Sequence, residues 1–139
     1  MARALLDTDT FSEIIKARNT HLMRIAHAYR QQYGRYTIST VTLTEMVKGL
    51  QKRAREDRIQ GLITRLASEE LLPLDLEAAV IAGRIYGALE KSGRTIGRAD
   101  PLIAGIAVAN NLTLVTGNTK HFERIVALGF PLLLDDWRQ

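Results

Sequence analysis

The chain has no cysteine and only three prolines in 139 residues. The absence of cysteine excludes disulfides and thiolate metal sites. The three histidines (His21, His27 and His121) are isolated and lack the spacing of a zinc site. Any metal site must therefore be built from oxygen ligands, which suit Mg²⁺ or Mn²⁺.

Long apolar runs are also missing. No segment approaches the roughly 20 apolar residues of a membrane span, and the apolar stretch at Ala4–Leu6 is too short for a secretory signal. We therefore expect a cytoplasmic protein without a membrane partner. Repeats, low-complexity segments and Pro/Gly-rich linkers are absent, which predicts one domain over residues 1–139.

The charge balance is modestly basic, with 19 Lys and Arg against 15 Asp and Glu and a net charge of +4. A basic surface favours a polyanionic partner such as nucleic acid. One basic run is typical either of a solvated helix face or of a surface that contacts RNA or an acidic partner segment. It comprises Lys48, Lys52, Arg53, Arg55 and Arg58. Arg94 and Arg98, in a glycine-flanked loop, are better placed to contact phosphate.

Alternating short apolar segments and helical patterns indicate the fold class. Buried strands are predicted at Arg3–Leu6, Tyr36–Ser39 and Leu112–Thr116. Leu71–Leu74 and Pro131–Leu134 are weaker candidates because each contains a proline. Apolar residues at helical spacing predict the intervening helices, at Phe11–Ala17, His21–Gln32, Val41–Lys52, 59–66, Leu76–Lys91, Pro101–Asn110 and 121–126. This alternation predicts an α/β fold with a central parallel sheet flanked by helices.

Polar residues stand where the predicted strands meet the following helices. Asp7 ends the first strand, and Glu45 lies in the expected first turn of the helix after Tyr36–Ser39. Asp100 opens the helix before the third strand, and Asn118 follows that strand. In parallel α/β sheets these positions share one edge, where ligands bind. Asp7, Glu45 and Asp100 are therefore expected to converge in one pocket.

Helix capping offers a second explanation for the same residues. Two stretches, Thr10–Glu13 and Thr42–Glu45, fit the capping box of Ser/Thr followed three residues later by Glu. Asp100-Pro101 fits an N-cap followed by a proline at the first helical position, and Asn118 is suited to cap a short helix.

Convergence of the three carboxylates has a chemical consequence. They would repel one another and raise one another's pKa unless a cation neutralised them, and a divalent metal does so. A metal held in this way promotes attack of water on a phosphoryl group without a nucleophilic side chain. The pattern therefore indicates metal-assisted phosphodiester hydrolysis.

Four stretches follow one another along nearly the whole chain. They are Leu5-Leu6-Asp7-Thr8, Ser39-Thr40-Val41-Thr42-Leu43-Thr44-Glu45, Gly97-Arg98-Ala99-Asp100-Pro101-Leu102-Ile103-Ala104 and Leu114-Val115-Thr116-Gly117-Asn118-Thr119-Lys120-His121-Phe122. In content and order they resemble the PIN-domain ribonucleases, and more closely the VapC-type toxins of bacterial toxin–antitoxin pairs.

The resemblance implies a PIN-like fold and a Mg²⁺- or Mn²⁺-dependent endoribonuclease, acting on tRNA or other structured RNA. It also implies a homodimer inhibited by a VapB-like antitoxin, with higher hetero-oligomers. Asp7, Glu45 and Asp100 match the family's three acidic metal positions. Asn118 completes the expected catalytic set where the family commonly has an acidic residue. An amide carries no charge, so the number of metal ions stays open.

Further residues of these stretches are expected to support the metal ligands or to contact phosphate: Thr8, Asp9, Arg98 and Thr116. Many relatives carry Asn where this chain has Asp9, and we expect Asp9 to cap the first helix or to add charge behind the metal ligands. His121 is expected at the surface, and Trp137 in the packed interior.

Two other functions remain open at this point. Asp7-Thr8-Asp9 imitates the Asp-x-Asp opening of haloacid-dehalogenase-type phosphatases, although Phe11 stands in place of their usual Thr. A catalytically inactive PIN-like binding module would keep the scaffold but would not need the three carboxylates.

Overall fold

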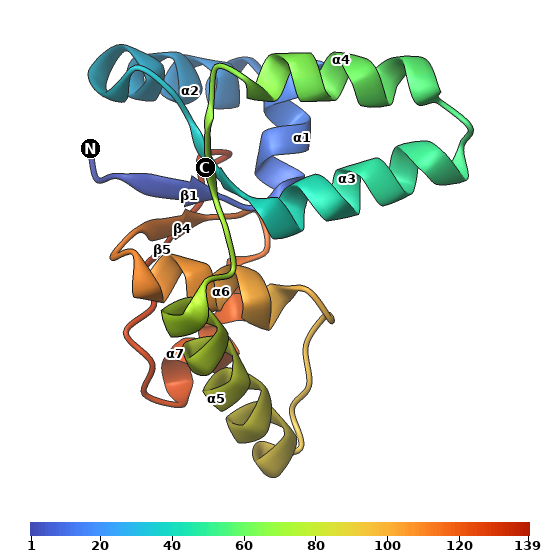
Figure 1. Ribbon diagram of the computed structural model, residues 1–139. Coiled ribbons are helices and arrows are strands. Elements are labelled where there is room, and N and C mark those ends of the chain that lie inside the picture. The colour runs from blue at the N-terminus through green and yellow to red at the C-terminus, as the bar shows by residue number, and fades with distance from the viewer.

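The computed structural model describes all 139 residues and contains a five-stranded parallel sheet between helical layers (Figure 1). The strands are β1 (Ala4–Leu6), β2 (Thr37–Ser39), β3 (Glu70–Leu72), β4 (Thr113–Val115) and β5 (Leu134–Asp135), in the order β3-β2-β1-β4-β5. Leu6 of β1 pairs with Ile38 on one side and with Val115 on the other. The predicted single α/β domain is confirmed, and its first strand lies at the centre.

The predicted strands agree with the observed strands to different degrees. The three main ones are found in place, each trimmed by one or two residues at its ends. The two weaker candidates are displaced: β3 begins at Glu70 and ends before Pro73, and β5 begins only at Leu134. Proline lacks the N–H that a strand ladder uses, which is consistent with both strands excluding it.

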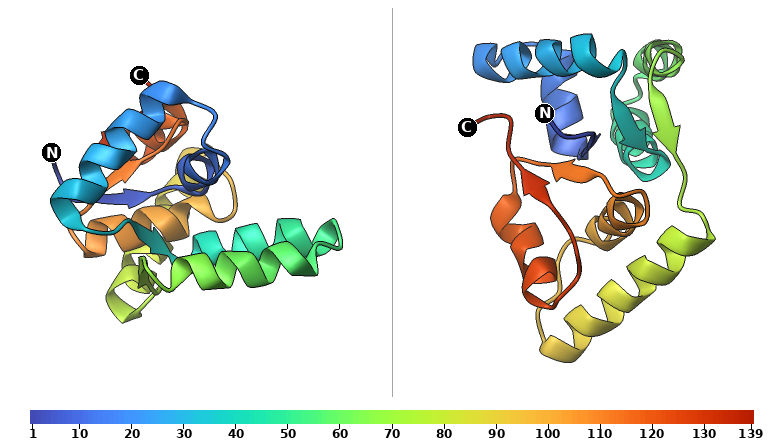
Figure 2. Two further views of the ribbon diagram at one scale, coloured as in Figure 1. Left: turned by 90° about the horizontal axis from the view of Figure 1, so that it is seen from above. Right: turned by 90° about the vertical axis from the view of Figure 1, so that its left-hand side faces the viewer.

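The side chains of β1 divide the core into two halves. Ala4 and Leu6 pack under α1 (Thr8–Lys16), α2 (Thr20–Tyr33) and α4 (Glu56–Leu66). Leu5 points to the other face, which is covered by α5 (Leu76–Ser92), α6 (Asp100–Ala109) and α7 (Thr119–Ala127). This alternation follows from the two-residue period of a strand. α3 (Thr40–Lys52) packs beside α4, and the two project from the sheet as an arm (Figures 1 and 2).

The observed starts of α1 and α3 differ from those that the capping motifs predicted. Asp7 is the N-cap of α1, so Asp9 lies inside the helix and the predicted cap at Thr10 is wrong. Ser39 caps α3 by accepting a hydrogen bond from the Thr42 N–H at 3.0 Å, which places Glu45 beyond the first turn.

The later helix starts also lack the predicted side-chain caps. Asp100 is the first residue of α6, whose start has no side-chain cap, and Asn118 precedes α7 without a capping bond. The side chains of Asp9, Glu45, Asp100 and Asn118 are therefore not engaged in helix capping. No helix is long and apolar enough to cross a membrane.

Close packing of α5 on α6 depends on a glycine. A Cβ added at Gly105 would stand 2.7 Å from the carbonyl oxygen of Ala78 and 2.9 Å from the Cβ of Ala82. We expect Gly105→Ala to lower the free energy of unfolding by about 1–3 kcal/mol, because neither neighbour can move without shifting α5. Urea denaturation measures this change.

Gly83→Ala is the matched control, because a Cβ there would meet open space. We expect this change to raise the free energy of unfolding by about 0.5–1 kcal/mol through helix propensity alone. Equal effects of the two substitutions would contradict the tight α5–α6 contact.

Candidate active site at the sheet edge

Three carboxylates from separate segments meet at the carboxyl end of the central strand. Asp7 follows β1, and its N–H donates to the Val115 carbonyl of β4 at 2.9 Å. Glu45 reaches the same edge from α3, and Asp100 from the start of α6. The charge of Asp100 contributes to the raised pKa of Asp7, and that of Glu45 to the raised pKa of Asp100. The three carboxylates therefore lie at one sheet edge within electrostatic reach, whereas their predicted meeting in one pocket stays a prediction.

Asp7 is the most buried of these groups, with 7% of its surface exposed. Its Oδ2 accepts a hydrogen bond from the Thr116 hydroxyl and its Oδ1 one from the Thr8 N–H, each at 2.8 Å. Burial first, and the negative charge of Asp9 second, raise the pKa of Asp7 to about 7. The two hydrogen bonds act in the opposite direction but do not offset the burial.

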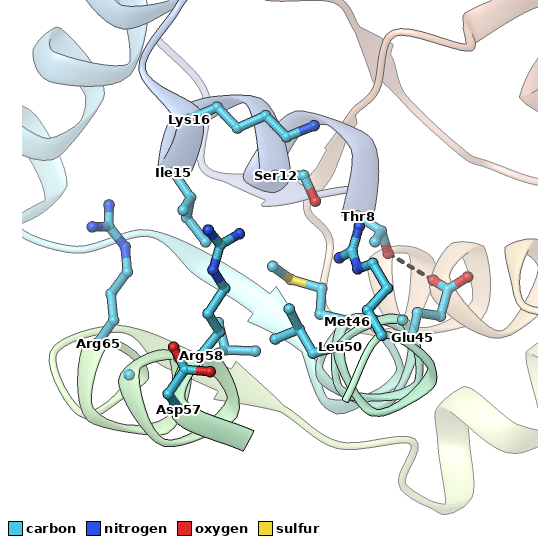
Figure 3. A pocket seen from close by; sticks show the side chains of 14 residues that line it. Thr8, Ser12, Ile15, Lys16, Glu45, Met46, Leu50, Asp57, Arg58 and Arg65 are labelled. Atoms are coloured by element: carbon cyan, nitrogen blue, oxygen red, sulfur yellow. Dashed lines mark hydrogen bonds between the residues drawn. The ribbon is translucent and has the colours of Figure 1, made fainter. Parts of the chain in front are cut away.

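Glu45 is held by a threonine from the neighbouring helix. The Thr8 hydroxyl donates to Oε1 of Glu45 at 2.6 Å and lies 3.0 Å from the Thr42 hydroxyl (Figure 3). Thr8 thus joins the start of α1 to α3 and fixes the direction of the Glu45 side chain.

Asp100 has a histidine partner. Nε2 of His121, on α7, lies 2.8 Å from Oδ2 of Asp100 and 3.2 Å from the backbone nitrogen of Gly97. Burial raises the pKa of Asp100, the interaction with His121 lowers it, and Glu45 and Asp9 add to the increase. His121 is therefore half-buried against a site carboxylate, and the expectation of a surface histidine is wrong.

Asp9 is held toward the turn between β4 and α7. Its Oδ2 accepts hydrogen bonds from the Gly117 N–H at 3.1 Å and from Nη2 of Arg138 at 2.7 Å. Its expected role as a helix cap is therefore wrong. Arg138 was not anticipated, because a contact between residues 129 positions apart leaves no local pattern in the sequence.

Of the remaining predicted site residues, Thr116 contacts Asp7 directly, whereas Asn118 and Arg98 are exposed. Thr116 is fully buried, and its hydroxyl accepts from the Asn118 N–H at 3.1 Å while it donates to Asp7. Asn118 is exposed at the rim. Arg98 is exposed in the loop before α6, where its carbonyl accepts a hydrogen bond from the Tyr86 hydroxyl and its guanidinium pairs with no carboxylate.

In this structure no group of three Asp, Glu or His side chains is arranged so that it could hold a metal ion. Glu45 is turned to Thr8 and Asp100 to His121, so each carboxylate is engaged by its own partner. The donor set nevertheless fits a hard divalent cation, because it consists of carboxylate oxygens. The raised pKa values of Asp7 and Asp100 indicate that positive charge would be favoured there.

A groove of about 640 Å³ leads from this site along α1, α3 and α4 (Figure 3). Thr8 and Glu45 line it, so the groove and the carboxylate site are continuous. Its apolar lining comprises Ile15, Met46, Leu50 and Leu62, and its basic lining comprises Lys16, Arg53, Arg58 and Arg65. Within the predicted basic run, Arg53 and Arg58 thus face the groove, whereas Arg55 pairs with Asp57 at 3.0 Å.

Comparison with known proteins agrees with this geometry. The PIN domain family model matches residues 4–128. The chain is 33% identical to the tRNA(fMet)-specific endonuclease VapC of Salmonella typhimurium, over 99% of each chain. It is 31% identical to ribonuclease VapC2 of Haemophilus influenzae, over 92% of this chain and 96% of that protein. The structure of DNA-bound VapBC from Salmonella typhimurium superposes with a TM-score of 0.80, at 31% identity and 99% coverage of both chains.

These similarities also decide between the functions left open by the sequence. The phosphatase alternative needs Asp9 as a free reactive group, but Arg138 and Gly117 engage that carboxylate, and the family match is to ribonucleases. The carboxylate site lies within the matched segment, at the ligand-binding edge of the sheet. The chain belongs to the PIN-domain family and is a VapC-type endoribonuclease toxin.

Proposed function

We propose that this endoribonuclease works with Mg²⁺ or Mn²⁺, held by Asp7, Glu45 and Asp100. The observation that supports the assignment is that three carboxylates from β1, α3 and α6 lie at one sheet edge, where Asp100 contributes to the raised pKa of Asp7 and Glu45 to that of Asp100. PIN-domain VapC nucleases are in general dependent on divalent metals. Glu45 and Asp100, which contact Thr8 and His121 in this structure, would hold the cation together with Asp7.

The protein side chains have distinct tasks in this mechanism. A divalent cation held by these carboxylates would supply a Lewis acid for the phosphate and would lower the pKa of a water. Thr116 and the Thr8 N–H keep Asp7 in a fixed direction, so it needs no reorganisation when charge develops on the substrate. The amide of Asn118 is suited to orient a water without adding charge.

The substrate is proposed to be tRNA or another structured RNA. A curated relative over the full length of the chain is a tRNA(fMet)-specific endonuclease. Such a substrate also places the protein in the cytoplasm. We propose that the whole of residues 1–139 forms the working PIN domain, because β5 and the buried Trp137 lie beyond the matched segment yet complete the sheet and core.

The proposed protein partner is a VapB-like antitoxin, because related structures are VapBC complexes. We also propose that the toxin is a homodimer, as the resemblance to VapC-type toxins implies. The groove along α1, α3 and α4 suits an antitoxin segment that combines apolar and acidic side chains. Since the groove ends at Thr8 and Glu45, a segment lying in it would cover the carboxylate site.

The metal assignment is tested on RNA cleavage. We expect Asp7→Asn, Glu45→Gln and Asp100→Asn each to slow cleavage of end-labelled tRNA in Mg²⁺ on the order of 100-fold or more, because each removes a charged ligand. EDTA should stop the wild-type reaction and added Mn²⁺ should restore it. Glu77→Gln, at an exposed carboxylate of α5, is the matched control. Wild-type rates in the three site variants, with an unchanged circular dichroism spectrum, would overturn the assignment.

The raised pKa of Asp7 predicts a pH-dependent stability of the metal-free protein. Between about pH 4 and pH 7 the folded state keeps the proton that the unfolded state loses, so the free energy of unfolding falls as pH rises through this window. Asp7→Asn mimics the neutral acid. In EDTA it should be roughly 1–3 kcal/mol more stable than wild type at pH 8, with a smaller gain at pH 5. A gain that does not vary with pH in urea titrations would contradict the raised pKa.

The antitoxin groove is tested by charge reversal. Arg53→Glu with Arg58→Glu should weaken binding of the cognate antitoxin at least about tenfold, because an acidic segment would then meet like charge. Isothermal titration measures the affinity. Arg84→Glu with Lys91→Glu, at exposed positions on α5, makes the same charge change away from the groove. If the groove pair and the α5 pair have the same effect, the antitoxin binds elsewhere.

A further inference from the structure

The C-terminal segment brings a guanidinium to the edge of the carboxylate site. Trp137 is 3% exposed, and its ring lies 5.2 Å from that of Tyr29, which anchors the segment in the core. The next residue, Arg138, turns back over the sheet edge. Its N–H donates to Oδ1 of Asp136 at 2.9 Å, and its side chain is 30% exposed. The packing of Trp137 and this hydrogen bond to Asp136 thus hold the guanidinium in place at the sheet edge.

Arg138 lies directly against the turn between β4 and α7. A Cβ added at Gly117 would overlap the guanidinium, so the absence of a side chain at position 117 makes room for it. Nη2 donates to Oδ2 of Asp9 at 2.7 Å, and the Gly117 N–H donates to the same oxygen at 3.1 Å. Asp9 therefore has two partners that hold it toward the turn.

The charge of Asp9 acts on the other carboxylates. After burial it is the largest contribution to the raised pKa of Asp7, and it also contributes to that of Asp100. Asp9 is thus close enough to the cluster to act as a further anion there. Arg138 is its cationic partner, whereas His121 lies against Asp100.

We infer that Arg138 is a positioning residue that acts through Asp9: it holds this carboxylate out of the metal ligand set and thereby weakens the affinity of the free enzyme for divalent cations. The inference rests on the proposed metal centre at Asp7, Glu45 and Asp100. Without the guanidinium, Asp9 would add an unpaired negative charge beside these ligands, and its side chain would be free to turn toward the cation.

The test is Mn²⁺ affinity of the full-length protein without RNA, measured by isothermal titration with MnCl₂. Arg138→Gln should bind Mn²⁺ about 3- to 10-fold more tightly than wild type, because a nearby positive charge is lost. Gly117→Ala keeps Arg138 but displaces its guanidinium, so it should show the same direction. Arg138→Lys keeps the charge and should stay near wild type. Arg35→Gln removes an exposed arginine at the opposite end of β2 and is the charge-matched control.

A double variant tests whether Asp9 transmits the effect. Arg138→Gln combined with Asp9→Asn should return the affinity close to the wild-type value, because both charges of the pair are removed. If the double variant binds as tightly as Arg138→Gln alone, Asp9 is not the route and the inference is overturned.

The remaining outcomes separate this inference from the metal centre itself. Mn²⁺ binding in Arg138→Gln that equals or falls below wild type would overturn the inference; a lower melting temperature alone would then mark Arg138 as a tie for the C-terminal segment. If wild type takes up no Mn²⁺, both the metal centre and the inference are wrong. If wild type binds Mn²⁺, Asp7→Asn abolishes this binding and Arg138→Gln leaves it unchanged, the metal centre stands and only the inference falls.

Discussion

A carboxylate buried at the end of the central strand is the constraint on which the site depends. Asp7 cannot leave this place, because β1 pairs on both sides and the Asp7 N–H continues the ladder to β4. Burial disfavours its charge, and two hydrogen bonds offset only part of that cost, which leaves its pKa at about 7. The other carboxylates at this sheet edge add to its negative charge, and their basic partners offset part of it.

The strand order explains how the other groups reach Asp7. With β1 in the middle of β3-β2-β1-β4-β5, the helices that follow β2 and the turn that follows β4 both start beside it. Each of the other carboxylates contacts its own partner: Glu45 contacts Thr8, Asp100 contacts His121, and Asp9 contacts Arg138. The metal-free site is thus stabilised by three separate pairings, which also explains why no ready-made set of three metal ligands is present.

The sequence could predict the parts of this site that depend on local pattern. Apolar runs that end at polar residues located β1, β2 and β4, and the shared edge of parallel strands then brought Asp7, Glu45 and Asp100 together. The predicted helix caps were wrong because α1 and α3 begin earlier, after Asp7 and Ser39, than the Thr residues that fit the capping-box motif. His121 and Arg138 were missed because their partners lie on other segments, and only tertiary packing decides which isolated charges meet.

The pairings also make the site electrically asymmetric. On the β4–α7 side Asn118 carries no charge, and Arg138 lies 2.7 Å from Asp9 and 3.8 Å from Asp136, so it offsets part of the negative charge there. On the side of α3 and α6 lie Asp7, Glu45 and Asp100, of which Glu45 contacts Thr8 and Asp100 contacts His121. The proposed metal centre at Asp7, Glu45 and Asp100 would thus occupy the more acidic side of the site. The β4–α7 side, where Arg138 offsets carboxylate charge, would then be the side better suited to receive the anionic phosphate of RNA.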